Sequence, residues 1–146
     1  MTPVQGRNCA AALILHEGRY LMQLRDNNPA IFLPNHWASF GGGIDPGEDA
    51  AAAMVRELEE ELEFHPRRID FFTEMTVVLP LTPPRLDRMS FFAIEATAAE
   101  LALMVQHEGA GRALFSPEEL AREARVAPWD LAGLLMHARQ AALFGG

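Results

Sequence analysis

The sequence has one cysteine, no lysine and no long apolar run, which excludes an internal disulfide and a membrane-spanning helix. Cys9 has no partner for an internal disulfide, and its apolar surroundings favour a buried structural thiol over a reactive one. The longest apolar run, residues 9–15, is far shorter than the roughly 20 residues that a membrane-spanning helix needs. Residues 1–4 show no basic stretch followed by an apolar one, so no secretory signal is expected. We therefore expect a cytoplasmic protein without a membrane partner.

The charge balance limits the class of partner. All 12 basic residues are arginine, and with 20 acidic residues the net charge is −8. The arginines form no stripe along the sequence, so a nucleic-acid partner is not expected. A phosphorylated small molecule would also be repelled at long range, unless cations bound at its site overcame the repulsion. The length of 146 residues, with 49% apolar and 22% charged residues, predicts one globular domain over residues 1–146.

Hydrophobic periodicity predicts a mixed α/β (α+β) domain with one sheet and few helices. Strands are expected over residues 8–16, 19–25, 37–40, 69–79, 88–96, 101–106 and 113–115. The glycines at positions 41–43 are expected to end the third of these strands. Helices are expected from the N-cap Asp49 to Leu62, after the capping box of Ser116 and Glu119, and over residues 130–143 behind Asp130 as a cap.

The helix expected after Asp49 combines an apolar face with a separate row of glutamates. Its core face is expected to consist of Ala51, Met54, Val55, Leu58 and Leu62. Glu57, Glu60 and Glu61, spaced i, i+3, i+4, share another arc of about 100°. Like charges at this spacing destabilise a helix, whereas clustered carboxylates are good ligands for Mg²⁺. A solvated acidic face is the alternative, but the preceding glycines allow a close approach to a ligand and favour a binding site.

The spacing around this helix resembles a known motif. Gly42, five residues, Glu48, seven residues and then Arg56-Glu57-Leu58-Glu59-Glu60-Glu61-Leu62-Glu63-Phe64 resemble the Nudix box, GX5EX7REUXEEXGU, where U is apolar. Every charged position of the motif is present. The resemblance implies a Nudix fold over the whole chain, a mixed β-sheet sandwiched between helices, and a MutT-like hydrolase that uses Mg²⁺, with Mn²⁺ able to substitute.

Two positions depart from the family pattern. Glu63 stands where the family has a glycine that ends the helix in a left-handed conformation. Because a residue with a Cβ fits that conformation less well, we expect a different helix end, such as one further turn closed by Pro66. Phe40 stands where many members have proline, which would reshape the loop wall without removing a ligand.

The resemblance also implies a role for each matching residue. Glu57, Glu60 and Glu61 would bind the cations together with a carbonyl of Gly41 or Gly42. Arg56 and Glu48 would pair and brace the loop against the helix. Glu57 is the base that the family most often suggests. Glu108 lies in a turn over residues 106–109 that resembles the Glu-Gly turn beside the metals in MutT-like members. It is a candidate extra ligand or general base, with an ordinary turn carboxylate as the alternative.

Three further residues are candidates for substrate binding. Arg25 resembles an arginine that contacts substrate phosphate in MutT-like enzymes, with a surface arginine as the alternative. Trp37 is a candidate for stacking on a nucleobase, although its alternating context favours a core or rim aromatic. Asp130 is a candidate base contact as well as a helix cap. The five histidines show no metal-ligand spacing.

The expected reaction is hydrolysis of the pyrophosphate bond in a nucleoside diphosphate linked to another group. This class includes nucleoside triphosphates, oxidised ones among them, and nucleotide sugars. Pro80 resembles a marker of ADP-ribose-type members, without the rest of their pattern. A non-catalytic nucleotide-sensing module is the alternative, but such modules often lose the box carboxylates. An isoprenoid isomerase would be expected to have a longer chain and a catalytic cysteine. Homodimers are common among relatives.

Overall fold

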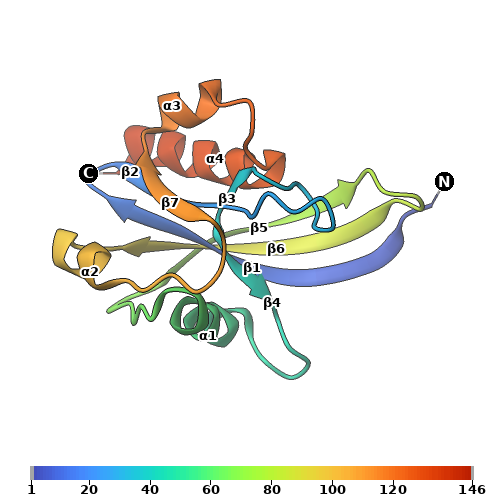
Figure 1. Ribbon diagram of the computed structural model, residues 1–146, viewed down its shortest axis with the longest axis horizontal. Coiled ribbons are helices and arrows are strands. Elements are labelled where there is room, and N and C mark those ends of the chain that lie inside the picture. Colours follow the sequence, from blue (N-terminus) through green and yellow to red (C-terminus); the bar gives the residue numbers. More distant parts are fainter. Residues whose placement is uncertain (1, 146) are drawn as a thin grey trace.

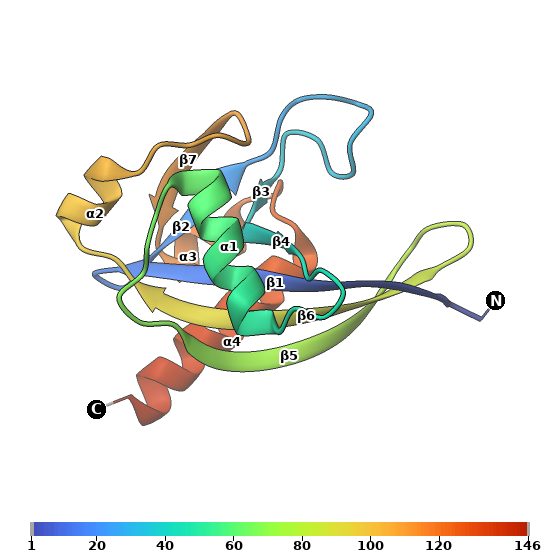
Figure 2. The same ribbon diagram turned by 90° about the horizontal axis from the view of Figure 1, so that it is seen from below.

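The chain folds into one twisted, seven-stranded sheet with helices on both sides, as Figures 1 and 2 show. The computed structural model describes residues 2–145. The strands are β1 (Val4–His16), β2 (Arg19–Leu24), β3 (Trp37–Ala38), β4 (Phe40–Gly43), β5 (Asp70–Leu79), β6 (Arg85–Glu95) and β7 (Gly111–Phe115). The helices are α1 (Ala50–Leu62), α2 (Ala98–Leu103), α3 (Pro117–Arg122) and α4 (Pro128–Phe144).

Strand β1 is the centre of the sheet. The main strand order is β3-β2-β1-β6-β5, with β4 paired to β1 and β7 paired to β2. β1 runs parallel to β6 and antiparallel to β2 and β4. The hairpin from β1 to β2 turns at Glu17 and Gly18, whose φ values of +50° and +76° match the twist of the flanking strands. The long β1, β5 and β6 extend beyond the helices towards the N-terminus (Figure 1).

Two apolar layers fill the space between the sheet and the helices. Alternate residues of β1 point to opposite faces, because side chains alternate along a strand. Ala10, Ala12 and Ile14 pack with the residues of α1, whereas Ala11 and Leu13 pack with the residues of α4. Figure 1 shows α1 and α4 on opposite sides of the sheet. The predicted mixed sheet sandwiched between helices is confirmed. Within residues 2–145, no helix is long and apolar enough to span a bilayer.

Helix α1 begins where the sequence predicts, but the set of residues that it buries differs from the expected one. The Asp49 carboxylate caps it by accepting a hydrogen bond from the Ala52 amide at 2.7 Å. Met54, Leu58 and Leu62 are buried as expected. The inclusion of Ala51 and Val55 in the core face is wrong, since both are exposed. The buried arc instead includes Ala53 and Glu61, so one glutamate of the predicted row lies against the sheet.

Three other expectations about local structure are wrong. The segment expected as a strand over residues 101–106 begins within helix α2, because Thr97 and Glu100 form a capping box that starts a helix there. The glycines at positions 41–43 do not end a strand; they belong to β4, which pairs with residues 9–12 of β1. Asp130 does not cap α4. Pro128 opens that helix and Ala127 is its N-cap, so Asp130 falls in the first turn and is buried.

Candidate active site

The glycines of β4 bring the α1 carboxylates against the edge of the sheet. Gly41 has φ +143°, and a Cβ at this position would lie 2.0 Å from the Ala10 carbonyl oxygen, so only glycine fits. Its amide donates a hydrogen bond to Glu61 Oε2 at 3.1 Å. A Cβ at Gly42 would lie 2.6 Å from the carboxyl carbon of Glu57. Two box glutamates therefore sit directly on the backbone of the two glycines that the sequence singles out.

Arg56 and Glu48 form the ion pair that the sequence predicts between the helix and the loop before it. Arg56 donates from Nε and Nη2 to the two Glu48 carboxylate oxygens, at 2.8 and 2.9 Å. This bidentate hydrogen bond lowers the pKa of Glu48 to about 2 and raises the pKa of Arg56. Arg56 also donates from Nη1 to Glu57 at 3.0 Å and approaches Glu60 at 3.3 Å. One guanidinium thus orients the loop and two helix carboxylates.

Glu61 is the most deeply buried carboxylate of the group, with 4% of its surface exposed. The pKa of its carboxyl is raised to about 9, mainly by burial and in part by the negative charges of Glu108 and Glu57, while the hydrogen bond from the Gly41 amide opposes the rise. The turn that carries Glu108 is tied to the end of α1, because the His107 amide donates to the Glu61 carbonyl at 2.8 Å. Glu60 lies at the rim, with 58% of its side chain exposed.

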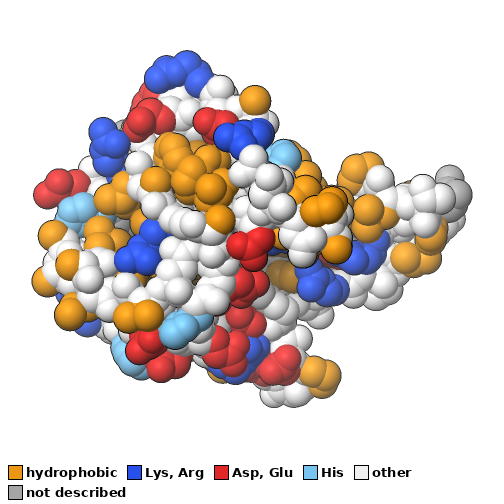
Figure 3. Space-filling view, viewed as in Figure 1, with side chains coloured by type: hydrophobic (Ala, Val, Ile, Leu, Met, Phe, Trp, Pro, Cys, Tyr) orange, Lys and Arg blue, Asp and Glu red, His pale blue; other side chains and the backbone are white. Residues whose placement is uncertain are grey.

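The donors around Glu61 fit a hard divalent cation. All the side chains concerned are carboxylates, which Mg²⁺ prefers, and a bound cation would offset both the burial of the Glu61 charge and its repulsion by Glu108 and Glu57. They do not form a finished cage: across the part of the chain that the structure describes, no three acidic, imidazole or thiol side chains already converge on one point. Glu57 is instead turned towards Arg56. Figure 3 shows acidic side chains in a row over β4 and α1 on this face.

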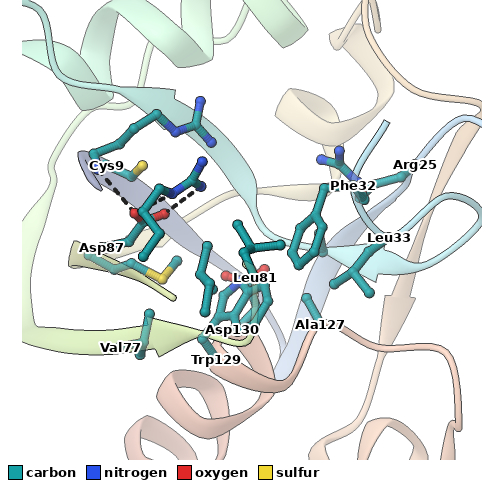
Figure 4. A pocket seen from close by; sticks show the side chains of 15 residues that line it. Cys9, Arg25, Phe32, Leu33, Val77, Leu81, Asp87, Ala127, Trp129 and Asp130 are labelled. Carbon is teal, nitrogen blue, oxygen red and sulfur yellow. Dashed lines mark hydrogen bonds and ion pairs between the residues drawn. The ribbon is translucent and has the colours of Figure 1, made fainter. Parts of the chain in front are cut away.

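A cavity of about 410 Å³ lies on the α4 side of the sheet (Figure 4). Its lining includes two of the three predicted substrate-binding residues, Arg25 and Asp130. It also includes Trp129 and Phe32, whose rings stack at 5.8 Å between centroids with 7° between planes. Trp37 is not among the lining residues. It packs edge-on against Phe115 at 4.8 Å in the apolar layer, which agrees with the core alternative for this residue.

The cavity and the carboxylates are joined by one short piece of chain. Ala38 lines the cavity, and Gly41, three residues later, donates to Glu61. Three residues of chain span at most about 10 Å, so Ala38 and Gly41 lie close together. Trp129 and Phe32 are lining aromatics that the sequence analysis does not predict. Only the packing of loop 25–33 against α4 brings them together.

Cys9 also lines the cavity and is half-buried, whereas the sequence predicts a buried structural thiol. Burial raises the pKa of its thiol, which favours the protonated form.

A family model described as the NUDIX domain matches residues 6–135, which is most of the chain. The chain belongs to the NUDIX domain family. The family membership predicted from residues 42–64 is thereby confirmed.

Individual relatives agree with this assignment. The nucleoside triphosphatase NudI of Salmonella arizonae is 41% identical over 56 residues, which cover 38% of this chain and 39% of the relative. The match thus spans well under half the length of that curated relative. The solution structure of the E. coli ORF135 protein superposes with a TM-score of 0.75 at 21% identity, covering 97% of this chain and 94% of that one. The E. coli dihydroneopterin triphosphate pyrophosphohydrolase gives 0.75 at 16% identity, covering 96% and 100%. At these identities the likeness shows the fold.

Glu63 stands where the Nudix box has glycine, and helix α1 does not end there in the way the sequence predicts. The expected further turn closed by Pro66 is wrong: α1 ends at Leu62, and Glu63 adopts the left-handed conformation, with φ 50° and ψ 37°. Its amide still donates to the Glu59 carbonyl at 3.0 Å, as a glycine cap would. The Glu63 side chain reaches the turn before Glu108, where its Oε2 lies 2.5 Å from His107 Nε2.

Glu63→Gly is expected to stabilise the protein. Glycine adopts the left-handed conformation without the steric cost of a Cβ, which is about 1 kcal/mol. The lost contact with His107 is half-exposed and contributes less than that. We expect Tm to rise by a few degrees in calorimetry. A fall in Tm would show that the His107 contact outweighs the backbone strain.

Asp130→Asn is expected to change how stability depends on pH. Burial raises the pKa of Asp130 to about 6, from an ordinary value of 3.8, although Ser39 and Arg25 oppose the rise. Between these two pH values the unfolded chain releases a proton that the folded chain retains, so the free energy of unfolding falls as pH rises. Between these two pH values the free energy of unfolding falls by about 3 kcal/mol. Thermal melts from pH 3.5 to 7 should show it in the wild type and not in the variant. The same dependence of Tm on pH in the wild type and the variant would contradict this prediction.

Proposed function

We propose that this chain hydrolyses a phosphoanhydride bond of a nucleoside triphosphate or a related nucleoside diphosphate derivative, with Mg²⁺ as the cation. The observation that carries the proposal is that Glu57 and Glu61 lie directly against the backbone of Gly42 and Gly41, three to four residues along the chain from Ala38, which lines the aromatic cavity. The name of the NudI relative, a nucleoside triphosphatase, supports the same substrate class.

The metal would be held by carboxylates of α1 and of the turn over residues 106–109. The proposed ligands are Glu57, Glu60, Glu61 and Glu108 together with a carbonyl of Gly41 or Gly42. Mn²⁺ prefers the same oxygen ligands and would substitute. When bound, the cation supplies charge neutralisation for the phosphate oxygens and lowers the pKa of a water molecule.

The residues of the chain itself provide orientation and proton transfer. Glu57 is proposed to accept the proton of the attacking water on its carboxylate. One of its oxygens accepts a hydrogen bond from Arg56 Nη1, which leaves the other oxygen available. Glu48 holds Arg56 by two hydrogen bonds, so the loop and the base keep a fixed relation. Glu48 and Arg56 are therefore positioning residues.

The nucleoside is proposed to bind in the cavity, between the carboxylates and α4. Phe32 and Trp129 offer apolar surface to the base, and the Asp130 carboxyl can hydrogen-bond its polar edge. Arg25 uses Nε on the Phe32 carbonyl, which orients its remaining donors for a phosphate. We assign no substrate contact to Trp37, because its ring packs against Phe115.

The proposal is tested with a panel of nucleoside di- and triphosphates, nucleotide sugars and dinucleotides, scored for release of phosphate, pyrophosphate or nucleoside monophosphate. We expect turnover with Mg²⁺ and none after chelation with EDTA. Tight nucleotide binding without turnover across the panel would contradict the enzyme and support a nucleotide-sensing module. The homodimer stays a prediction, which light scattering on the purified protein tests.

A further inference from the structure

The end of the cavity away from Arg25 carries a buried ion pair. Asp87, on β6, is 5% exposed and accepts two hydrogen bonds from Arg85, at 2.9 and 3.0 Å. The Arg7 amide donates a third, at 3.0 Å. Burial opposes ionisation of Asp87, but these donors outweigh it and lower the pKa of the carboxyl. Figure 4 shows Asp87 across the cavity from Arg25 and Phe32.

The backbone is shaped around this pair. A Cβ at Gly6 would lie 2.1 Å from Asp87 Oδ1 and 2.5 Å from Arg85 Cγ, so the pair fits only against a glycine. The pairing of β1 with β6 also shifts register between Gln5 and Asn8. Such irregularities change the direction in which side chains point, and they are frequent beside functional sites. A buried ion pair contributes little to stability by itself, so stability does not account for this construction.

The pair leaves positive charge facing the cavity. Arg85 uses Nε and Nη2 on Asp87, and among the described residues its Nη1 has no hydrogen-bond partner. The Arg7 guanidinium likewise makes no hydrogen bond or ion pair within residues 2–145, although it lines the same cavity. Two arginines thus face one carboxylate. Arginines held in this way suit a phosphate, because their planar donors match its oxygens.

The position of the arginines indicates which phosphate they would meet. Ala11 pairs with Gly41, beside Glu61, and Arg7 lies four residues back along β1, about 13 Å away. Neighbouring phosphates of one chain share a single oxygen, so an anion at Arg7 would lie too far along β1 to be the neighbour of one at Glu61. It would belong to another part of the ligand.

We propose that Arg7 and Arg85 bind a second phosphate group carried on the ribose of the substrate, at its 2′ or 3′ position. The place of this subsite in catalysis rests on the proposed function, whereas its affinity for phosphate does not. The substrate class is then a nucleotide phosphorylated at both ends of its nucleoside.

The test compares binding by calorimetry, which needs no turnover. The probes are the 5′-monophosphates of the four common nucleosides and their 2′,5′- and 3′,5′-bisphosphates. We expect at least one bisphosphate to bind about tenfold or more tightly than its monophosphate, the effect of a charge-assisted hydrogen bond. Arg7→Ala, an exposed position whose backbone amide is retained, should remove most of this ratio, and Arg85→Lys should reduce it.

Arg88→Ala is the matched control. Arg88 lies on the same strand as Arg85, is exposed, does not line the cavity and approaches Glu74 at 3.4 Å. Its loss should leave the ratio unchanged. A wild-type ratio near one for every nucleoside, or equal loss in Arg7→Ala and Arg88→Ala, would overturn the subsite. Failure of the proposed function would instead appear as absent turnover with the binding ratio intact.

Discussion

Replacing Glu57 or Glu61 with glutamine is expected to lower turnover at least about a hundredfold, the effect of losing a proton-transfer or metal group. Glutamine keeps the size of each side chain and an oxygen acceptor. In the Glu61→Gln variant the amide oxygen can therefore still accept the hydrogen bond that the Gly41 amide donates at 3.1 Å. Only the negative charge is removed, so a loss of activity would report charge and not folding. Steady-state turnover with saturating Mg²⁺ measures it.

Stability measurements distinguish a loss of turnover caused by the missing charge from one caused by a destabilised fold. Burial raises the pKa of Glu61 to about 9, so without a cation the neutral side chain is favoured there. Glu61→Gln should therefore melt no lower than the wild type in EDTA. Glu59→Gln is the matched control, since Glu59 lies on the same helix, is half-exposed and stands at a variable position of the box. Near-normal turnover in both test variants would exclude these carboxylates from the reaction.

The box and its helix could be predicted from sequence because the signals are local. The Asp49 cap, the spacing of Met54, Leu58 and Leu62, and the row of glutamates all lie within a few turns. The same local patterns mislead where two of them compete. Residues 101–105 form a continuous apolar run like that of a short buried strand, yet the capping box of Thr97 and Glu100 starts a helix there. The stronger local hydrogen bonds decide the outcome.

The cavity could not be predicted because its residues meet only through packing. Trp129 stacks on Phe32, from a segment nearly a hundred residues away in sequence. The sequence neighbours of Asp130 indicate a helix cap, whereas the fold buries it beside Ser39 and Arg25. The prediction of the helix end at Glu63 is wrong for another reason. The fold keeps a left-handed turn that costs about 1 kcal/mol, because the backbone hydrogen bond of the cap and the path to Phe64 require it.

Gly42→Ala is expected to lower turnover about tenfold to a hundredfold while leaving the fold intact. The added methyl would lie 2.6 Å from the carboxyl carbon of Glu57 and 2.7 Å from both its oxygens. The clash is with the end of a flexible side chain, so Glu57 moves and the backbone does not. Displacing a reacting group by about 1 Å can cost a hundredfold in rate. We also expect a higher Mg²⁺ requirement for half-maximal activity.

Gly43→Ala separates this effect from a general loss of backbone freedom in β4. The same methyl at Gly43 meets no atom within 4 Å, so Glu57 should keep its position and activity should be close to normal. Melting temperatures within a few degrees for both variants would confirm that the strand is intact. Equal losses of turnover in the two variants would show that the strand backbone matters, and would remove the support that the Gly42 contact gives to Glu57 as the base.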